Sequence, residues 1–243
     1  MPLPRLIGLV GFANSGKDTA ADALPYPSCA FGDSLKDAVS AVFGISRTVL
    51  EGKTAESRSE RERSLSFWER AGTLHTVSAA FGSKNITPRM LLIHTAATLR
   101  NNISSDIFVL SLEKRLTDSS FRPDDVVVIK DCRFPNEMRW IKQHGGLLFC
   151  ISPSTPPPFP MDLARQAAKR LQHVSQPTID DMTLIEIGFK VPDPSEFLWL
   201  ACEDLLDGVI VNTLGQKDEF CSSVRSTIGA ALAATSWRLT TRS

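Results

Sequence analysis

The chain has 243 residues, a length that suits one α/β domain with an insertion better than two full domains. Lysine plus arginine and aspartate plus glutamate are balanced at 27 each, so no net charge draws the whole protein toward nucleic acid or an anionic membrane. The 5 cysteines include no C-x-x-C pair, which predicts reduced thiols, no structural zinc and a cytoplasmic location. No apolar run is long enough to cross a bilayer, so no membrane is expected as a partner.

The first predicted strand, residues 6–10, leads into the sequence GFANSGKDT at residues 11–19. This is the G-x-x-x-x-G-K spacing of a phosphate-binding loop. Its glycines let the backbone curl so that N–H groups face an anion, the following helix adds partial positive charge, and Lys17 reaches the outer phosphates. The segment predicts a site for a nucleoside triphosphate with Mg²⁺. The residues expected to bind it are Asn14, Ser15, Gly16, Lys17, Asp18 and Thr19.

The residue after the loop lysine is Asp18, where such loops usually carry a hydroxyl group that binds the metal. Two interpretations are open. Asp18 holds Mg²⁺ directly or through water while Thr19 contacts a phosphate oxygen, or Asp18 merely caps the helix.

A helix over residues 19–24 and a short strand over residues 29–31 are expected next. A second helix follows, because apolar residues recur at helical spacing from Leu35 onward. It places Lys36 near its start, where a cation suits the phosphate of a second substrate. A solvated surface lysine is the alternative.

Residues 47–70 are rich in arginine, glutamate and serine, and we expect a charged helical insertion over about residues 47–86. One interpretation is an anion-binding patch with Phe67 and Trp68 as stacking surfaces. The commoner outcome for such a composition is a solvated helix with many salt bridges. The arginines concerned are Arg58, Arg61, Arg63 and Arg70.

Thr87 and Pro88 have the pattern of a helix start, a hydroxyl cap followed by proline, and the helix that they begin carries Arg89. Another helix is expected over residues 106–116. Four β-favouring apolar residues at 126–129 then predict a strand buried on both faces of a parallel sheet.

Asp131 and Arg133 follow that strand, and ligands bind at the carboxyl ends of the strands in open parallel sheets. Glu137 is close enough in sequence to orient the guanidinium of Arg133. An ordinary surface ion pair is the alternative.

A further buried strand is predicted over residues 147–151, and the proline-rich residues 152–160 are expected to be irregular. The helical stretch beyond them would form a basic flap within a lid over about residues 152–192, or simply a solvated face. Its cations are Arg165, Lys169 and Arg170. The remaining expectations are an amphipathic helix over residues 195–206, a strand over 209–211 and a last helix.

Several of these features together resemble the bacteriophage deoxynucleoside monophosphate kinases. They are G-K-D-T at residues 16–19, the Leu-Lys helix start at residues 35–36, the Arg89 helix, D-x-R-x-x-x-E at residues 131–137, and a last strand ending in Asn212. The resemblance implies a three-layer P-loop α/β fold, ATP and Mg²⁺ as cofactors, and the host cytoplasm as location. It assigns the phosphoryl transfer to Lys17, Asp131 and Arg133, with acceptor binding by Lys36, Arg89 and Glu137. Asp131 would bind Mg²⁺ or take a proton, and Arg133 would stabilise the moving phosphoryl group.

The departures from the family pattern gather where the acceptor should bind. They are Leu92, Thr95 and Ala96, Phe108, Ser152 in place of an arginine before Pro153, and His173-Val174-Ser175-Gln176. The donor chemistry is therefore kept while acceptor recognition is changed.

Three functions follow from this pattern. The favoured one resembles relatives that phosphorylate the 5-hydroxymethyl group of 5-hydroxymethyluracil in phage DNA, with Phe67, Trp68 or Trp140 as wedges that extrude the base. The alternatives are a deoxynucleoside monophosphate kinase that makes diphosphates, and a nucleotide-binding protein without catalysis.

Overall fold

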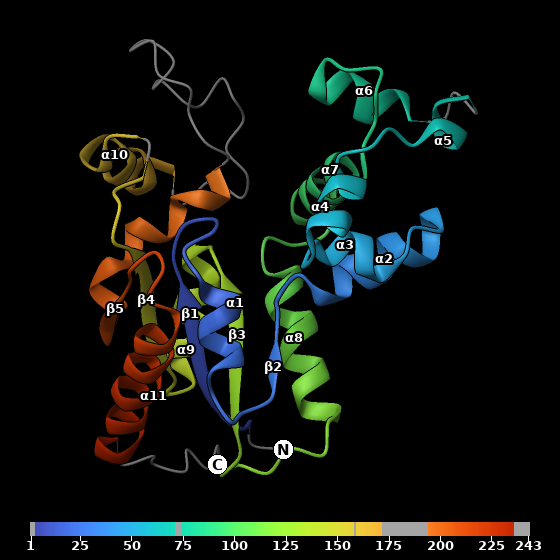
Figure 1. Ribbon diagram of the computed structural model, residues 1–243. Coiled ribbons are helices and arrows are strands. Elements are labelled where there is room, and N and C mark those ends of the chain that lie inside the picture. Colours follow the sequence, from blue (N-terminus) through green and yellow to red (C-terminus); the bar gives the residue numbers. More distant parts are fainter. Residues whose placement is uncertain (1–2, 71–73, 158, 172–193, 236–243) are drawn as a thin grey trace. The chain divides into compact units, whose positions relative to one another are not determined.

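The computed structural model describes residues 3–70, 74–157, 159–171 and 194–235 (Figure 1). The chain divides into two compact units, Gly32–Phe108 and the combination of Met1–Phe31 with Val109–Ser243. The discontinuous unit is called the sheet unit, and the continuous unit is called the helical unit. No helix in the described ranges is long and apolar enough to cross a membrane.

The sheet unit contains a parallel five-stranded sheet in the order β2-β3-β1-β4-β5. Its strands are β1 (Arg5–Val10), β2 (Ser28–Cys29), β3 (Val126–Cys132), β4 (Leu147–Pro153) and β5 (Gly208–Asn212). The central strand β1 is almost wholly buried, as its run of apolar residues predicts for a parallel sheet covered on both faces. The carboxyl ends of β1 and β3 therefore meet at one edge of the sheet.

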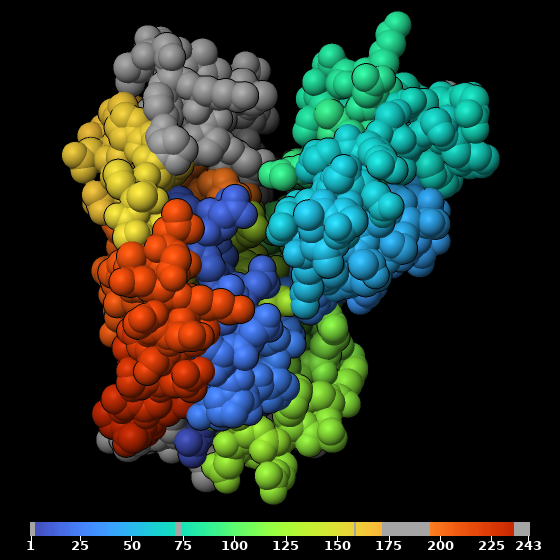
Figure 2. All heavy atoms as spheres, in the orientation of Figure 1, coloured from blue at the N-terminus to red at the C-terminus, as the bar shows by residue number. Residues whose placement is uncertain are grey.

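Helices cover both faces of this sheet, which confirms the predicted three-layer α/β fold of the P-loop type. The helices of the unit are α1 (Lys17–Asp22), α8 (Ile107–Asp118), α9 (Pro135–Gln143), α10 (Met161–Leu171) and α11 (Lys217–Ala234). On one face α1 and α11 lie side by side, in blue and red in Figures 1 and 2, and close a core around Ile7 and Leu9. On the other face Ile141 of α9 packs over Gly8. Alternate residues of β1 thus face opposite layers.

The proline-rich connection begins later than predicted. Ser152 and Pro153 extend β4 and pair with Val211 and Asn212 of β5. Ser154 donates its N–H to the carbonyl of Asn212 at 2.9 Å, so the nitrogen of Pro153 faces the opposite side. On that side the neighbouring strand is β1, which has already ended, because its last residue, Val10, pairs with Cys150 of β4. A proline is tolerated at this place since no neighbouring strand needs its N–H.

The amphipathic α-helix predicted over residues 195–206 is wrong in kind. The segment forms two 3₁₀ helices, η3 (Pro194–Glu196) and η4 (Leu198–Leu205), with a non-helical backbone at Cys202. Three consecutive side chains, Leu198, Trp199 and Leu200, are all buried. An α-helix with a single apolar face cannot bury three residues in succession, whereas this irregular segment does.

The helical unit holds six helices within its described residues. They are α2 (Asp33–Phe43), α3 (Arg47–Glu51), α4 (Ala55–Arg61), α5 (Ser66–Arg70), α6 (His75–Phe81) and α7 (Pro88–Asn102). Thr87 caps α7 as predicted, because its hydroxyl accepts the N–H of Met90 at 3.3 Å. The stretch 47–86, expected as an insertion, lies inside this unit and contributes Leu50 and Ile86 to its buried residues.

Candidate active site

The phosphate loop between β1 and α1 depends on two glycines with positive φ angles, Gly11 at 142° and Gly16 at 103°. A Cβ at Gly11 would collide with the carbonyl oxygen of Ile151, and one at Gly16 would collide with the side-chain amide of Asn212. Both positions therefore exclude other residues on two grounds, conformation and space. The loop curls as its sequence predicts.

Lys17 lies at the start of α1 and is only 8 % exposed. Its Nζ donates to the carbonyl oxygens of Gly11 and Phe12, at 2.7 Å each. Burial, and secondly the charge of Arg133, lower the pKa of Lys17 to about 8, although the nearby carboxylates, Glu196 first, oppose this shift. The ammonium group is thus desolvated and held against the loop, where an incoming phosphate would complete its coordination.

The buried side chain of Ser15 bears on whether this loop fits a triphosphate. Its Oγ is buried and has no hydrogen-bond partner among the described residues. Its carbonyl oxygen accepts the Asn212 Nδ2 at 2.9 Å, which fixes the loop to the end of β5. An unpartnered hydroxyl costs free energy unless a ligand supplies a partner, so the loop fits a phosphate chain.

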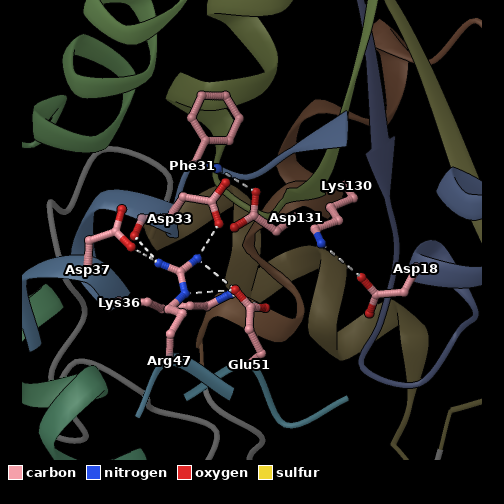
Figure 3. A network of polar contacts seen from close by, with 9 residues as sticks. All are labelled: Asp18, Phe31, Asp33, Lys36, Asp37, Arg47, Glu51, Lys130 and Asp131. Atoms are coloured by element: carbon pink, nitrogen blue, oxygen red, sulfur yellow. Dashed lines mark hydrogen bonds and ion pairs between the residues drawn. The ribbon is translucent and has the colours of Figure 1, made fainter. Parts of the chain in front are cut away.

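Asp18 lies in the first turn of α1, and its side chain is 74 % exposed. The residue before α1 is Gly16, which has no side chain to cap the helix, and Asp18 is the acidic residue of the first turn. Its Oδ1 lies 3.7 Å from the Nζ of Lys130, a cation on β3 that sequence reasoning passed over (Figure 3). Thr19 follows and is partly buried.

The described residues contain no cluster of three or more metal-ligating side chains. Mg²⁺ is commonly held by one or two carboxylates together with substrate phosphates, so the predicted ligands Asp18 and Thr19 would need the phosphates of a bound nucleotide to complete a metal site.

Asp131 lies at the carboxyl end of β3, and its Oδ1 accepts the backbone N–H of Phe31 at 2.7 Å (Figure 3). This bond ties the β3 end to the residue that follows β2. The charge of Asp131 acts on Lys17, as does that of Arg133. The three residues assigned to phosphoryl transfer are thus gathered at one edge of the sheet.

Glu137 is 3 % exposed, and its Oε2 accepts the backbone N–H groups of Arg133 and Phe134 at 2.8 and 3.0 Å. It therefore shapes the turn between β3 and α9 rather than acting as an exposed ligand for an acceptor. The guanidinium of Arg133 contacts Glu196 Oε1 at 3.2 Å and the Ser195 hydroxyl at 3.4 Å. The expectation that Glu137 orients this guanidinium is corrected, because Glu137 positions the backbone and Glu196 contacts the side chain.

Glu196 also reaches the phosphate loop, since its Oε2 accepts the N–H of Ala13 at 2.6 Å. Sequence reasoning missed this residue. It lies within a segment predicted only as an amphipathic helix, and no local motif marks a contact across 183 positions.

In the helical unit, Lys36 donates to Glu51 Oε2 at 3.0 Å, and Glu51 also binds Arg47. Figure 3 shows Arg47 facing three carboxylates, those of Asp33, Asp37 and Glu51. Burial raises the pKa of Glu51, but the hydrogen bond from Arg47 and the charge of Lys36 outweigh it and lower the pKa to about 2. Lys36 is therefore held in an ion-pair network.

Other predicted cations are paired as well. Arg89 lies 3.5 Å from Glu62, Arg165 of α10 binds Glu203 at 2.8 Å, and Arg58 donates to a backbone carbonyl at 3.3 Å. Most of the predicted lid, with its His173 motif, lies outside the described residues.

The aromatic residues proposed as wedges differ in exposure. Trp140 is 6 % exposed and donates to Glu113 at 3.0 Å, so its assignment as a wedge was wrong. Phe67 is 65 % exposed, and its ring packs edge-on against that of Trp68. Trp68 donates to the Phe43 carbonyl at 3.2 Å.

A parallel sheet in this strand order, with a phosphate loop after its central strand, defines an α/β protein of the P-loop type. No family model matches the chain. The chain is 31 % identical over 160 residues to a protein of Acanthamoeba polyphaga mimivirus whose name assigns it provisionally as a deoxynucleotide monophosphate kinase. The match covers 60 % of this chain and 72 % of that protein. The chain therefore belongs to the deoxynucleotide monophosphate kinase family.

A solved structure of a provisionally assigned kinase from Chloroflexus aurantiacus is also similar. It is 14 % identical with a TM-score of 0.32, and the match covers 97 % of this chain and 100 % of that one.

Proposed function

We propose that the protein transfers the γ-phosphoryl group of ATP to the 5′-phosphate of a deoxynucleoside monophosphate, producing a deoxynucleoside diphosphate and ADP. The observation that carries the proposal is the gathering of Lys17, Asp131 and Arg133 at the carboxyl edge of the sheet, beside a loop with an unpartnered buried hydroxyl. Membership of the family supports the acceptor class.

The chemistry asks for charge stabilisation more than for covalent participation. An oxygen of the acceptor phosphate attacks the γ-phosphorus, and the bond from that phosphorus to the bridging oxygen of ADP breaks. The loop N–H groups and Lys17 bind the donor phosphates, while the guanidinium of Arg133 stabilises charge on the transferred group. Mg²⁺, held by Asp18 and Thr19, would neutralise charge on the donor phosphates.

The two candidate acceptors, a nucleoside monophosphate and a hydroxymethyl group, differ in whether they need Asp131 as a base. A nucleoside monophosphate attacks through an oxygen that is already ionised at neutral pH, so no base is needed. A hydroxymethyl group must lose a proton, and Asp131, oriented by Phe31, is the carboxylate that would take it. Phosphorylation of 5-hydroxymethyluracil in DNA is therefore kept as a second candidate. The substitutions at the acceptor positions, Ser152 among them, favour it, while the zero net charge weighs against DNA as a substrate.

The test is γ-labelled ATP supplied with each deoxynucleoside monophosphate and, separately, with DNA containing 5-hydroxymethyluracil. Label in a nucleoside diphosphate is the expected result. Label in DNA alone would replace the first candidate by the second, and no transfer to either acceptor would overturn both. Each reaction is run with Lys17→Ala as the control for a contaminating kinase.

A further inference from the structure

The carboxylate of Glu196 joins two parts of the candidate site. One oxygen accepts the N–H of Ala13 in the phosphate loop at 2.6 Å, and the other contacts the guanidinium of Arg133 at 3.2 Å. The side chain of Glu196 is 16 % exposed and that of Arg133 is 38 % exposed, so their contact is partly buried, while Ala13 lies at the surface. A single internal anion thus binds a loop donor and the site arginine together.

The backbone around Glu196 is fixed to the same loop. Its carbonyl oxygen accepts the indole N–H of Trp199 at 3.0 Å, and the ring of Trp199 packs against Phe12 with centroids 5.1 Å apart. Trp199 is 3 % exposed. Because Phe12 belongs to the phosphate loop, the position of the carboxylate results from packing and is not that of a free surface side chain.

The two donors that Glu196 binds, a loop N–H and a guanidinium, are of the kind that binds a phosphoryl group. Backbone N–H groups of the loop, a guanidinium and an ammonium bind phosphate oxygens, and the charge of Glu196 acts on Lys17 as well. A carboxylate and a phosphate cannot share the same donors at such short range, because their like charges repel strongly in a partly buried site. Nucleotide binding must therefore displace the Glu196 side chain.

We propose that Glu196 is an internal anion that occupies part of the terminal-phosphate position in the nucleotide-free protein and exchanges with the terminal phosphate of ATP. The inference rests on the proposed function. Before binding, Glu196 holds Arg133 and the loop near their working positions. It is a positioning residue, and its displacement lowers the affinity for ATP while leaving ADP, which lacks the third phosphate, less affected.

The decisive variant is Glu196→Gln, which keeps the shape of the side chain and removes its charge. Glu203→Gln is the matched control, because Glu203 lies in the adjoining η4 and pairs with Arg165 at 2.8 Å. Within the described part of the chain its carboxylate bonds to Arg165 and not to the loop or Arg133. Glu196→Ala is the second variant should the glutamine variant fold poorly. Calorimetric titration with ATP and with ADP, in the presence of Mg²⁺, gives both affinities for each protein.

We expect Glu196→Gln to bind ATP about tenfold more tightly than the wild type, since a charge-assisted hydrogen bond no longer competes. Its affinity for ADP should change much less, and Glu203→Gln should match the wild type for both ligands. Without nucleotide, Glu196→Gln should melt at a lower temperature. Equal or weaker ATP binding by Glu196→Gln, or an equal gain for ATP and ADP, would overturn the inference.

The proposed function can fail separately. Wild-type protein that binds ATP but transfers no phosphoryl group to either acceptor would count against the kinase reaction and leave the Glu196 comparison intact. Absence of ATP binding by both the wild type and Glu196→Gln would overturn both proposals.

Discussion

The side-chain amide of Asn212 donates to the carbonyl oxygen of Ser15 at 2.9 Å across 197 positions of the chain. It joins the last strand of the sheet to the first loop. The same amide would meet any side chain placed at Gly16, so it also sets the space in which the loop turns. The end of β5 is therefore part of the proposed donor site, although it contributes no charge.

Asn212→Asp should weaken ATP binding by roughly tenfold, because a carboxylate cannot donate to the Ser15 carbonyl and adds negative charge beside the triphosphate. Titration with ATP measures the effect. Asn101→Asp, an exposed position on α7 in the helical unit, is the control for a simple change in net charge. Equal affinities for Asn212→Asp and the wild type would mean that the loop holds its form without β5.

Lys17→Ala should abolish phosphoryl transfer while the melting temperature of the nucleotide-free protein stays the same or rises. The residue is a buried cation whose pKa is lowered to about 8, so its removal relieves a desolvation penalty. Turnover and thermal melting are measured on the same preparation. Lys114→Ala, which removes an exposed lysine paired with Asp118, should leave turnover unchanged. Near-normal turnover by Lys17→Ala would place the donor site elsewhere.

The affinity for ATP should fall as the pH rises above about 8. In the empty protein Lys17 loses its proton near pH 8, mainly because burial disfavours its charge, whereas bound phosphates favour the charged form. ATP binding therefore takes up a proton above this pH, and the loss approaches about tenfold per pH unit. Below about pH 8 the Lys17 contribution should be constant.

Calorimetry in buffers of different ionisation enthalpy measures that proton uptake directly. Folding stability without nucleotide should change in the opposite direction, rising between about pH 8 and the ordinary lysine pKa of 10.5, because the unfolded chain holds the proton longer. A pH-independent ATP affinity up to pH 10 would contradict the assignment.

Arg133→Lys should lower kcat by more than about tenfold, since a point charge cannot reproduce the two-pronged contact of a guanidinium with a transferring phosphoryl group. ATP affinity should change less, because the effect belongs to the transition state. Arg122→Lys, at an exposed arginine paired with Asp125, is the matched control. If Arg133→Lys retains the wild-type kcat, the guanidinium of Arg133 does not stabilise the transition state.

Glu51→Gln should lower the free energy of unfolding of the helical unit by about 2 kcal/mol at pH 7, because Arg47 and Lys36 lose their shared carboxylate. The pKa of Glu51 is lowered to about 2 in the folded state, so its stabilising effect is complete above the ordinary value of 4.5. The difference between variant and wild type should shrink as the pH falls from about 4.5 toward 2. Hydrogen exchange in α3 measures it, and Glu60→Gln, at an exposed position of α4, is the control.

The fold was predictable where the signal is local. The glycine spacing at residues 11–16, the apolar runs of β1 and β3 and the cap at Thr87 each determine a short segment without help from the rest of the chain. The 3₁₀ segment at residues 194–205 was not predictable, because burial of three side chains in succession depends on tertiary packing. Apolar periodicity alone cannot reveal such packing.

The site divides in the same way. A contact between Glu137 and Arg133, 4 positions earlier in the chain, was expected, but Glu137 accepts the backbone N–H of Arg133 and does not orient its guanidinium. Glu196 meets Ala13 and Arg133 through contacts that join distant parts of the chain, as does Lys130 with Asp18. A single sequence carries no local trace of such pairs, and only the fold brings them together.

The strand order has a consequence for how the protein is made. The helical unit is one continuous stretch of chain. Strand β1, in contrast, pairs with β3 and β4, which begin only at Val126 and Leu147. At a synthesis rate of about 5 to 20 residues per second, the apolar first strand spends on the order of ten seconds outside the ribosome without a neighbour. The helical unit can complete its folding in that interval. The phosphate loop is translated among the first residues, but its bond to Asn212 can form only after β5 has been made. A chain truncated before β5 would therefore keep the loop sequence and lack the contact that fixes the loop to the sheet.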